Sequence, residues 1–140
     1  MKNLYTARAT ATGGRNGHAR TDDGVVDVTI TPPKAMGGPG TAGATNPEQL
    51  FATGYAACFG SAVEFVARQR KTPLKPVEIT ADVTLGTEEG GAFRLAVTLT
   101  GRIPDQSKAA VDELMHAAHE VCPYSRATRG NIDVNLVAAG

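Results

Sequence analysis

The longest apolar stretch of the sequence predicts one long helix from Asn46 to Lys71. No charged residue lies between Glu48 and Glu64, and the apolar side chains leave no clear polar face. A helix that is apolar on every side is typical of one that is buried on every side. The segment Asn46-Pro47-Glu48-Gln49 is a helix start, because Asn caps, Pro suits the first position and Gln can complete a capping box. We therefore expect this helix to be the core of the fold, with Cys58 in its middle.

Alternation of apolar and polar residues predicts strands on both sides of this helix. The predicted strands are Tyr5–Thr12, His18–Thr21, Val25–Thr31, Val77–Leu85, Ala92–Arg102 and Asn131–Val137. A second helix, amphipathic and opened by Pro104-Asp105, is predicted from Gln106 to Val121. Pro123 follows it, so Cys122 is expected at its C-terminal end, facing inward. The order β-β-β-α-β-β-α-β predicts an α+β fold with an antiparallel-rich sheet and helices on one face.

A long loop rich in Gly and Pro, Thr31 to Thr45, contains the pattern G-x-G-x-x-G between Gly38 and Gly43. The pattern follows a strand and precedes a helix, as in dinucleotide-binding proteins. We reject that interpretation because the loop runs well past the motif, Pro39 lies inside it, and Glu48 would face the phosphates. A loop of this length is usually functional or disordered. One alternative function is therefore a binding module for a hydrophobic ligand, with this loop as a lid.

The length of the chain is typical of a single domain, spanning residues 1–140, and its positive and negative charges are balanced. Lys and Arg total 14 and Asp and Glu total 14, so no electrostatic field favours nucleic acid or a membrane. We find no signal peptide and no transmembrane segment, and we expect a cytoplasmic protein. Covering a helix on all sides is demanding for a chain of this size, which favours a homo-oligomer.

The chain has two cysteines, Cys58 and Cys122. In a reducing compartment a structural disulfide is disfavoured, so they are either inert core residues or redox-active ones. A reactive thiol must ionise, but a free Cys has a pKa of about 8.5 and burial raises it. A reactive Cys58 therefore needs a cation from elsewhere. Arg15, in the glycine turn 13–17, is the best candidate, and Glu48 is the acid that could hold its guanidinium. Glu48 could equally serve only the helix dipole.

A metal site is the alternative use of Cys122. His116, His119 and Cys122 recur at three-residue steps on one predicted helix and could meet a zinc ion. However, the two histidines lie towards the polar side of that helix and Cys122 on its apolar stripe. We interpret them as ordinary surface histidines.

Three further segments of the sequence form a pattern together. They are Asn46-Pro47-Glu48-Gln49-Leu50-Phe51-Ala52, Ala56-Ala57-Cys58-Phe59 and Val121-Cys122-Pro123-Tyr124-Ser125-Arg126-Ala127-Thr128-Arg129-Gly130-Asn131-Ile132-Asp133-Val134. This pattern resembles the organic hydroperoxide resistance branch of the OsmC/Ohr family, and the last segment is specific to this branch. The resemblance covers nearly the whole chain, including the N-terminal Tyr-Thr-Ala strand and the Gly-Gly-Arg turn.

The resemblance implies a thiol peroxidase that uses no metal or prosthetic group. Cys58 matches the peroxidatic cysteine, Cys122 the resolving cysteine, and Arg15 and Glu48 the active-site arginine and glutamate. It implies an intertwined homodimer whose sheets wrap long central helices, with active sites at the subunit interface. The implied substrates are alkyl and fatty-acid hydroperoxides, and the implied reductant is dihydrolipoamide or a lipoylated protein.

Two further expectations concern the geometry of this site. Apolar side chains near Cys58 would admit an alkyl or acyl chain, and we expect them to be Met36, Phe51, Tyr55 and Phe59. Glu48 and Cys58 are separated by about 15 Å along one helix and lie on different faces. If both belong to one site, Glu48 must come from the partner chain, or the helix must break near Gly54. We expect the partner chain.

Overall fold

The structure, a computed structural model, describes residues 1–139 as two compact units. The first unit is Met1–Leu50 and the second begins at Phe51. The boundary falls inside the long helix α1, Pro47–Gln69, whose first turn belongs to the first unit. The order of elements contains the predicted β-β-β-α-β-β-α-β series, with two short helices added to it. The fold is therefore α+β, as the sequence predicts.

The first unit is a small antiparallel sheet in the order β1-β2-β3. Its strands are β1 Ala9–Thr12, β2 Gly17–Thr21 and β3 Asp27–Ile30; β1 and β3 are shorter than predicted, and β2 begins one residue earlier than predicted. The β1–β2 turn requires glycine, because Gly13 and Gly14 have φ angles of 80° and 58°. This turn is closed by the Asn16 N–H, which donates to the Gly13 carbonyl. It places Arg15 at the tip of the hairpin.

The long loop after β3 is more ordered than the sequence suggests. It contains one turn of 3-10 helix, η1 Lys34–Met36, which ends where Gly37 adopts a left-handed φ of 76°. Its two ends are tied together by a parallel bridge between Ile30 and Thr45. The loop is therefore a closed structure that delivers the chain to the start of α1.

Helix α1 begins as the sequence predicts, because the Gln49 N–H donates to the Asn46 side-chain oxygen at 2.9 Å. It runs unbroken for 23 residues. Within the chain one face is buried, whereas Phe65 and other residues of the opposite face are exposed. The expectation of burial on all sides is thus not met within a single chain.

Helix α1 is as apolar as a membrane-spanning helix. By length and composition alone α1 could cross a membrane, although its uncharged run is shorter than a bilayer. Tyr55, Phe59, Val63 and Val66 on α1 are buried in the core of the second unit. A core helix of this kind accounts for the apolar sequence.

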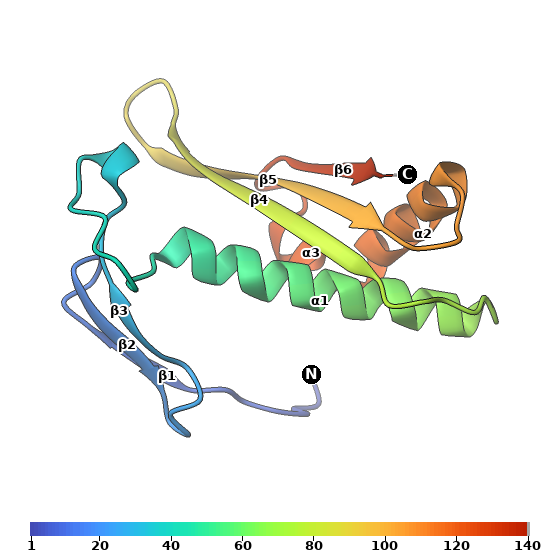
Figure 1. The fold of residues 1–140 in the computed structure, drawn as a ribbon, viewed down its shortest axis with the longest axis horizontal. Helices are drawn as coiled ribbons and strands as arrows, with labels where there is room; N and C mark the ends of the chain where they lie inside the picture. Colours follow the sequence, from blue (N-terminus) through green and yellow to red (C-terminus); the bar gives the residue numbers. More distant parts are fainter. Residues whose placement is uncertain (140) are drawn as a thin grey trace. The chain divides into compact units, whose positions relative to one another are not determined.

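The second unit is a three-stranded sheet with helices packed on it (Figure 1). Strand β5 pairs antiparallel with β4 and parallel with β6. Helix α2 begins at Lys108 and not at Gln106, because Ser107 caps it. Helix α3 was not predicted from the sequence; β6 starts only after the turn that closes α3. The bounds are β4 Glu78–Thr87, β5 Phe93–Arg102, α2 Lys108–Val121, α3 Pro123–Thr128 and β6 Val134–Ala138.

The helices pack against the face of the sheet that alternation predicts to be apolar. Ile79 on β4 and Gly101 on β5 are register partners. Ile79 lies beneath Gly60 of α1, and Gly101 lies beneath the fully buried Met115 of α2. The absence of a side chain at Gly101 therefore lets α2 approach the sheet.

We predict that Gly101→Ala destabilises the fold, because the added methyl would collide with the Met115 sulfur, which has no exposed space to move into. Overpacking of this kind costs about 1–3 kcal/mol of unfolding free energy. Urea denaturation measures it. The control is Gly86→Ala on β4, where the added methyl meets no atom within 4 Å. Equal stability of the two variants would contradict the packing described.

Candidate active site: a thiol pair and an arginine–glutamate pair

The two cysteines, 64 residues apart in sequence, lie side by side in the second unit. Both are free thiols, and the sulfur atoms of Cys58 and Cys122 lie 3.6 Å apart, within reach of a hydrogen bond between them. Cys58 is half-buried in the middle of α1, and Cys122 is fully buried. The pair is close enough for a small movement to join the two sulfur atoms in a disulfide.

Cys122 occupies the junction between two helices. Its N–H donates to the Ala118 carbonyl, so it ends α2, and its carbonyl accepts from the Arg126 N–H, so it begins α3. Its backbone is extended, with φ −61° and ψ 124°. The residue before a proline is pushed into this conformation, and Pro123 then suits the first helical position. The Cys-Pro dipeptide thus breaks the helix at the thiol.

The pKa of the Cys58 thiol is raised above its ordinary value. The largest cause is burial, and Cys122 adds to it by favouring the neutral thiol. The backbone N–H of Tyr124, in the first turn of α3, acts in the opposite direction by hydrogen bonding to the Cys58 sulfur. This N–H lowers the pKa of Cys58 by less than burial raises it. The thiolate therefore needs a further positive group.

Arg15 and Glu48 form a bidentate ion pair in the first unit. The two guanidinium nitrogens lie 2.9 and 2.6 Å from the two carboxylate oxygens of Glu48. The hydrogen bonds from Arg15 lower the pKa of Glu48, against a smaller opposing effect of burial, and the same pair raises the pKa of Arg15. The predicted partnership of these two residues is present. Because Cys58 belongs to the second unit, a joint site with Cys58 stays a prediction.

The continuity of α1 bears on that prediction. Glu48 and Cys58 lie on one unbroken helix, so they are separated by about 15 Å along its axis. A break near Gly54 is not present. A shared site for Glu48 and Cys58 thus favours the alternative in which the two residues come from different chains.

The four predicted pocket residues fall into three different environments. Tyr55 and Phe59 are fully buried. Phe51 is half-buried and its ring stacks on Tyr124, with ring centres 6.0 Å apart. Met36 is exposed in the first unit. Of the three predicted pocket residues in the second unit, Phe51 is thus the accessible one, while Tyr55 and Phe59 belong to the core.

Phe51 lines a hollow of about 480 Å³ in the second unit. Apolar side chains form part of it, together with an ion pair between Arg94 and Glu88. Arg94 also donates to the Asn131 carbonyl at 2.9 Å. The lining residues are Phe51, Glu88, Phe93, Arg94, Leu95, Ala127, Thr128, Asn131 and Ile132. The hollow is large enough to accept an alkyl chain beside Phe51.

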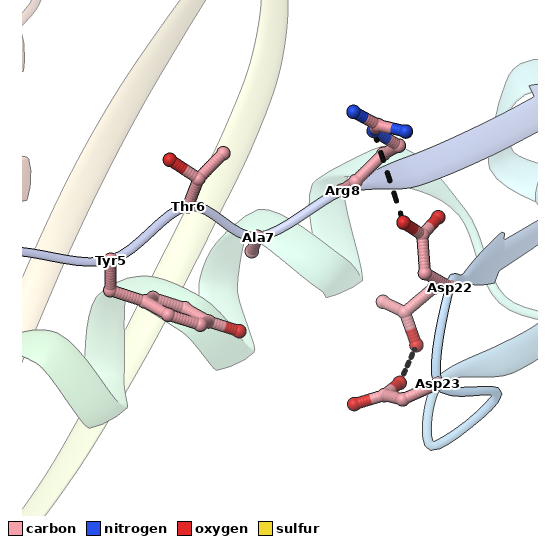
Figure 2. Close-up of a pocket in the computed structure, with 7 residues that line it drawn as sticks. Tyr5, Thr6, Ala7, Arg8, Asp22 and Asp23 are labelled. Carbon is pink, nitrogen blue, oxygen red and sulfur yellow. Dashed lines mark hydrogen bonds and ion pairs between the residues drawn. The ribbon is translucent and has the colours of Figure 1, made fainter.

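A second hollow, of about 440 Å³, lies in the first unit beside β1 (Figure 2). Arg8 and Asp22 form an ion pair at its edge, 3.8 Å apart, and the Thr21 hydroxyl donates to Asp23 at 2.6 Å. Tyr5 lines the same hollow. The predicted site residues do not line it.

Three residues of α3 that lie near the thiol pair were not predicted from the sequence. These are Tyr124, whose N–H contacts Cys58, and Ser125 and Thr128, which bind the hydroxyl of Tyr55. The signal was available, since all three lie in the Cys-Pro-Tyr-Ser…Thr segment that carries the family resemblance. Their contacts depend on α3, a helix too short to give a periodic pattern.

The alternative metal site does not assemble. Across residues 1–139 no three His, Cys, Asp or Glu side chains are grouped so as to hold a metal ion. His116 Nδ1 lies 2.9 Å from the Asp112 carbonyl and is exposed. His119 packs near Phe59, and its burial lowers its pKa.

Comparison with known proteins agrees with these features. The family model described as OsmC-like protein matches residues 38–137. The organic hydroperoxide resistance protein of Xanthomonas axonopodis pv. citri is 50% identical over 99% of this chain and 96% of its own length. OhrB of Bacillus subtilis, an organic hydroperoxide resistance protein, is 51% identical over 95% of this chain and 96% of its own.

A solved structure extends the likeness to three dimensions. It is a Vibrio cholerae protein described as a putative organic hydroperoxide resistance protein with captopril bound in one of its active sites. Its TM-score is 0.92 at 47% identity, covering 100% of this chain and 95% of that one.

We predict that Arg15 sets the titration of Glu48. In the native protein the Glu48 carboxyl should titrate below its ordinary value of 4.5, and Arg15→Gln should return its pKa towards that value. Because the folded pKa is lowered, the pair stabilises the fold above pH 4.5, and this stability is lost as the pH falls through the folded pKa. Carbon-13 NMR of the Glu48 carboxyl measures the titration.

The control for this titration is Arg20→Gln, which removes an exposed arginine that pairs with Asp27 in the same sheet. It should leave the pKa of Glu48 unchanged. An unshifted Glu48 in the native protein would contradict the ion pair.

Proposed function

Because the chain belongs to the OsmC-like family, in its organic hydroperoxide resistance branch, we propose that it is a cysteine-based peroxidase that reduces organic hydroperoxides to alcohols. The relatives' names support a role in organic hydroperoxide resistance. The observation that carries the proposed chemistry is the distance of 3.6 Å between the two free sulfur atoms, Cys58 and Cys122.

The first step is oxidation of Cys58. Its thiolate attacks the outer oxygen of the hydroperoxide, so that a sulfur–oxygen bond forms and the oxygen–oxygen bond breaks. The alkoxide leaves and takes up a proton to become the alcohol. Cys58 is left as a sulfenic acid, having supplied the two electrons.

The second step closes a disulfide. The sulfur of Cys122 attacks the Cys58 sulfenic acid, the sulfur–sulfur bond forms, and the hydroxyl leaves as water with the Cys122 proton. The short separation of the thiols favours this step over further oxidation. A dithiol then opens the disulfide by exchange and becomes a disulfide itself.

Arg15 would supply the missing positive charge. The pKa of Cys58 is raised by burial, so the thiolate requires a cation, and the same guanidinium would stabilise the departing alkoxide. The bidentate bond from Glu48 would orient that guanidinium. We propose a homodimer in which Glu48 of one chain serves Cys58 of the other, since α1 separates them within one chain.

The substrate would be an alkyl or fatty-acid hydroperoxide. Phe51 and its hollow would bind the chain of such a substrate. Met36, Tyr55 and Phe59 remain proposed pocket residues, although Tyr55 and Phe59 would contact the substrate only after a change in the core. The proposed reductant is dihydrolipoamide or a lipoylated protein, and the proposed compartment is the cytoplasm.

We predict that Cys58→Ser abolishes consumption of cumene hydroperoxide with dihydrolipoamide as the reductant. Cys122→Ser should allow the first oxidation but slow recycling, because the Cys58 sulfenic acid forms but cannot close the protein disulfide that the dithiol opens. A coupled peroxide assay measures both, run beside thioredoxin and glutathione as alternative reductants.

Circular dichroism of each variant checks that it is folded. Full turnover by Cys58→Ser would contradict a cysteine-based peroxidase. An absence of turnover by the native protein with every reductant would favour a hydrophobic-ligand binding module whose cysteines are inert.

A further inference from the structure

A chain of buried hydroxyl groups joins α1 to α3 next to the thiol pair. The Tyr55 hydroxyl lies 3.0 Å from Ser125 Oγ and 3.2 Å from Thr128 Oγ1. Tyr55 and Ser125 are fully buried, and Thr128 is 8% exposed. Buried hydroxyls that satisfy one another in this way fix a geometry, because breaking one bond leaves a polar group unpaired.

The donor and acceptor in each of these hydrogen bonds can be assigned, starting from Thr128. Thr128 Oγ1 lies 3.0 Å from the Tyr124 carbonyl and 3.1 Å from the Ser125 carbonyl, and these oxygens can only accept. The Thr128 hydroxyl therefore donates to the α3 backbone. Tyr55 then donates to Thr128, and Ser125 donates to Tyr55. Each of the three hydroxyls is used once as a donor.

The hydroxyl chain is attached to both cysteines through the helices. Tyr55 precedes Cys58 by three residues on α1, so the two are neighbours on the helix surface. Ser125 lies in the α3 turn that starts at Cys122, and the Tyr124 N–H of that turn contacts the Cys58 sulfur. A shift of α3 along α1 would thus move Cys122 away from Cys58.

A second contact supports the same register. The Tyr124 ring stacks on Phe51, and its hydroxyl would lie 3.1 Å from a methyl group placed at Gly54. The glycine lets the ring approach α1 closely.

We propose that Tyr55, Ser125 and Thr128 are positioning residues, whose hydroxyl chain holds α3 in the register that keeps the Cys122 sulfur against the Cys58 sulfur. In the proposed reaction, on which this role rests, they speed attack of Cys122 on the sulfenic acid. They also favour the protein disulfide over the dithiol at equilibrium.

The test is the equilibrium between the protein dithiol and a glutathione redox buffer, read by alkylation and mass spectrometry. The protein has two cysteines, so a single disulfide is measured. Tyr55→Phe should lower the equilibrium constant for disulfide formation by about tenfold, the effect of losing one to two buried hydrogen bonds. Thr128→Val should do the same, whereas Thr128→Ser, which keeps the hydroxyl, should restore the native value.

The control is Val66→Ala, a core truncation on α1 that removes no hydrogen bond. It should lower the free energy of unfolding without changing the disulfide equilibrium. If Tyr55→Phe does not fold, Ser125→Ala and Thr128→Val carry the test. An unchanged or larger equilibrium constant in folded variants without these hydroxyls would overturn the proposal.

The assay contains no peroxide, so it separates this role from the proposed function. A native protein that forms the disulfide with glutathione but consumes no hydroperoxide would refute the peroxidase. The positioning role is refuted only by the variants.

Discussion

A thiol that is buried resists ionisation, and Cys58 lies in the middle of a helix whose inward face is the core of its unit. The burial that surrounds Cys58 with apolar groups suited to an organic substrate also raises its pKa. The features of the proposed site answer this conflict. The Tyr124 N–H gives partial compensation from α3, and in the proposed dimer the Arg15–Glu48 pair would provide a cation of fixed orientation for the remainder.

The proposed chemistry also requires that oxidation of Cys58 be reversible, and the Cys-Pro junction would serve this requirement. Pro123 ends α2 and starts α3 at Cys122, so the proposed resolving thiol is held by backbone bonds on both sides. The buried hydroxyls of Tyr55, Ser125 and Thr128 then attach this junction to α1. Packing and polar contacts thereby serve one purpose, the approach of two sulfur atoms distant in sequence.

Much of this arrangement could be predicted from the sequence because it rests on local signals. The Asn46 cap, the glycine turn that carries Arg15 and the β4–β5 hairpin each follow from residues close together in the chain. Helix α3 could not be predicted in this way, since six residues give no helical period. The hydrogen bonds of Tyr55 could not be predicted for the same reason. Its apolar ring suggested a pocket residue, whereas in the structure Tyr55 is buried and its hydroxyl is hydrogen-bonded to α3.

The central claim is that the Cys58–Cys122 pair is a two-electron reductant for organic hydroperoxides. Its most direct test is a stoichiometric reaction without added reductant, in which one equivalent of cumene hydroperoxide is mixed with the reduced protein. We expect that both thiols are lost, that one equivalent of alcohol appears, and that the protein mass falls by two hydrogen atoms through a disulfide between Cys58 and Cys122. Two thiols that remain free while the hydroperoxide persists would contradict it.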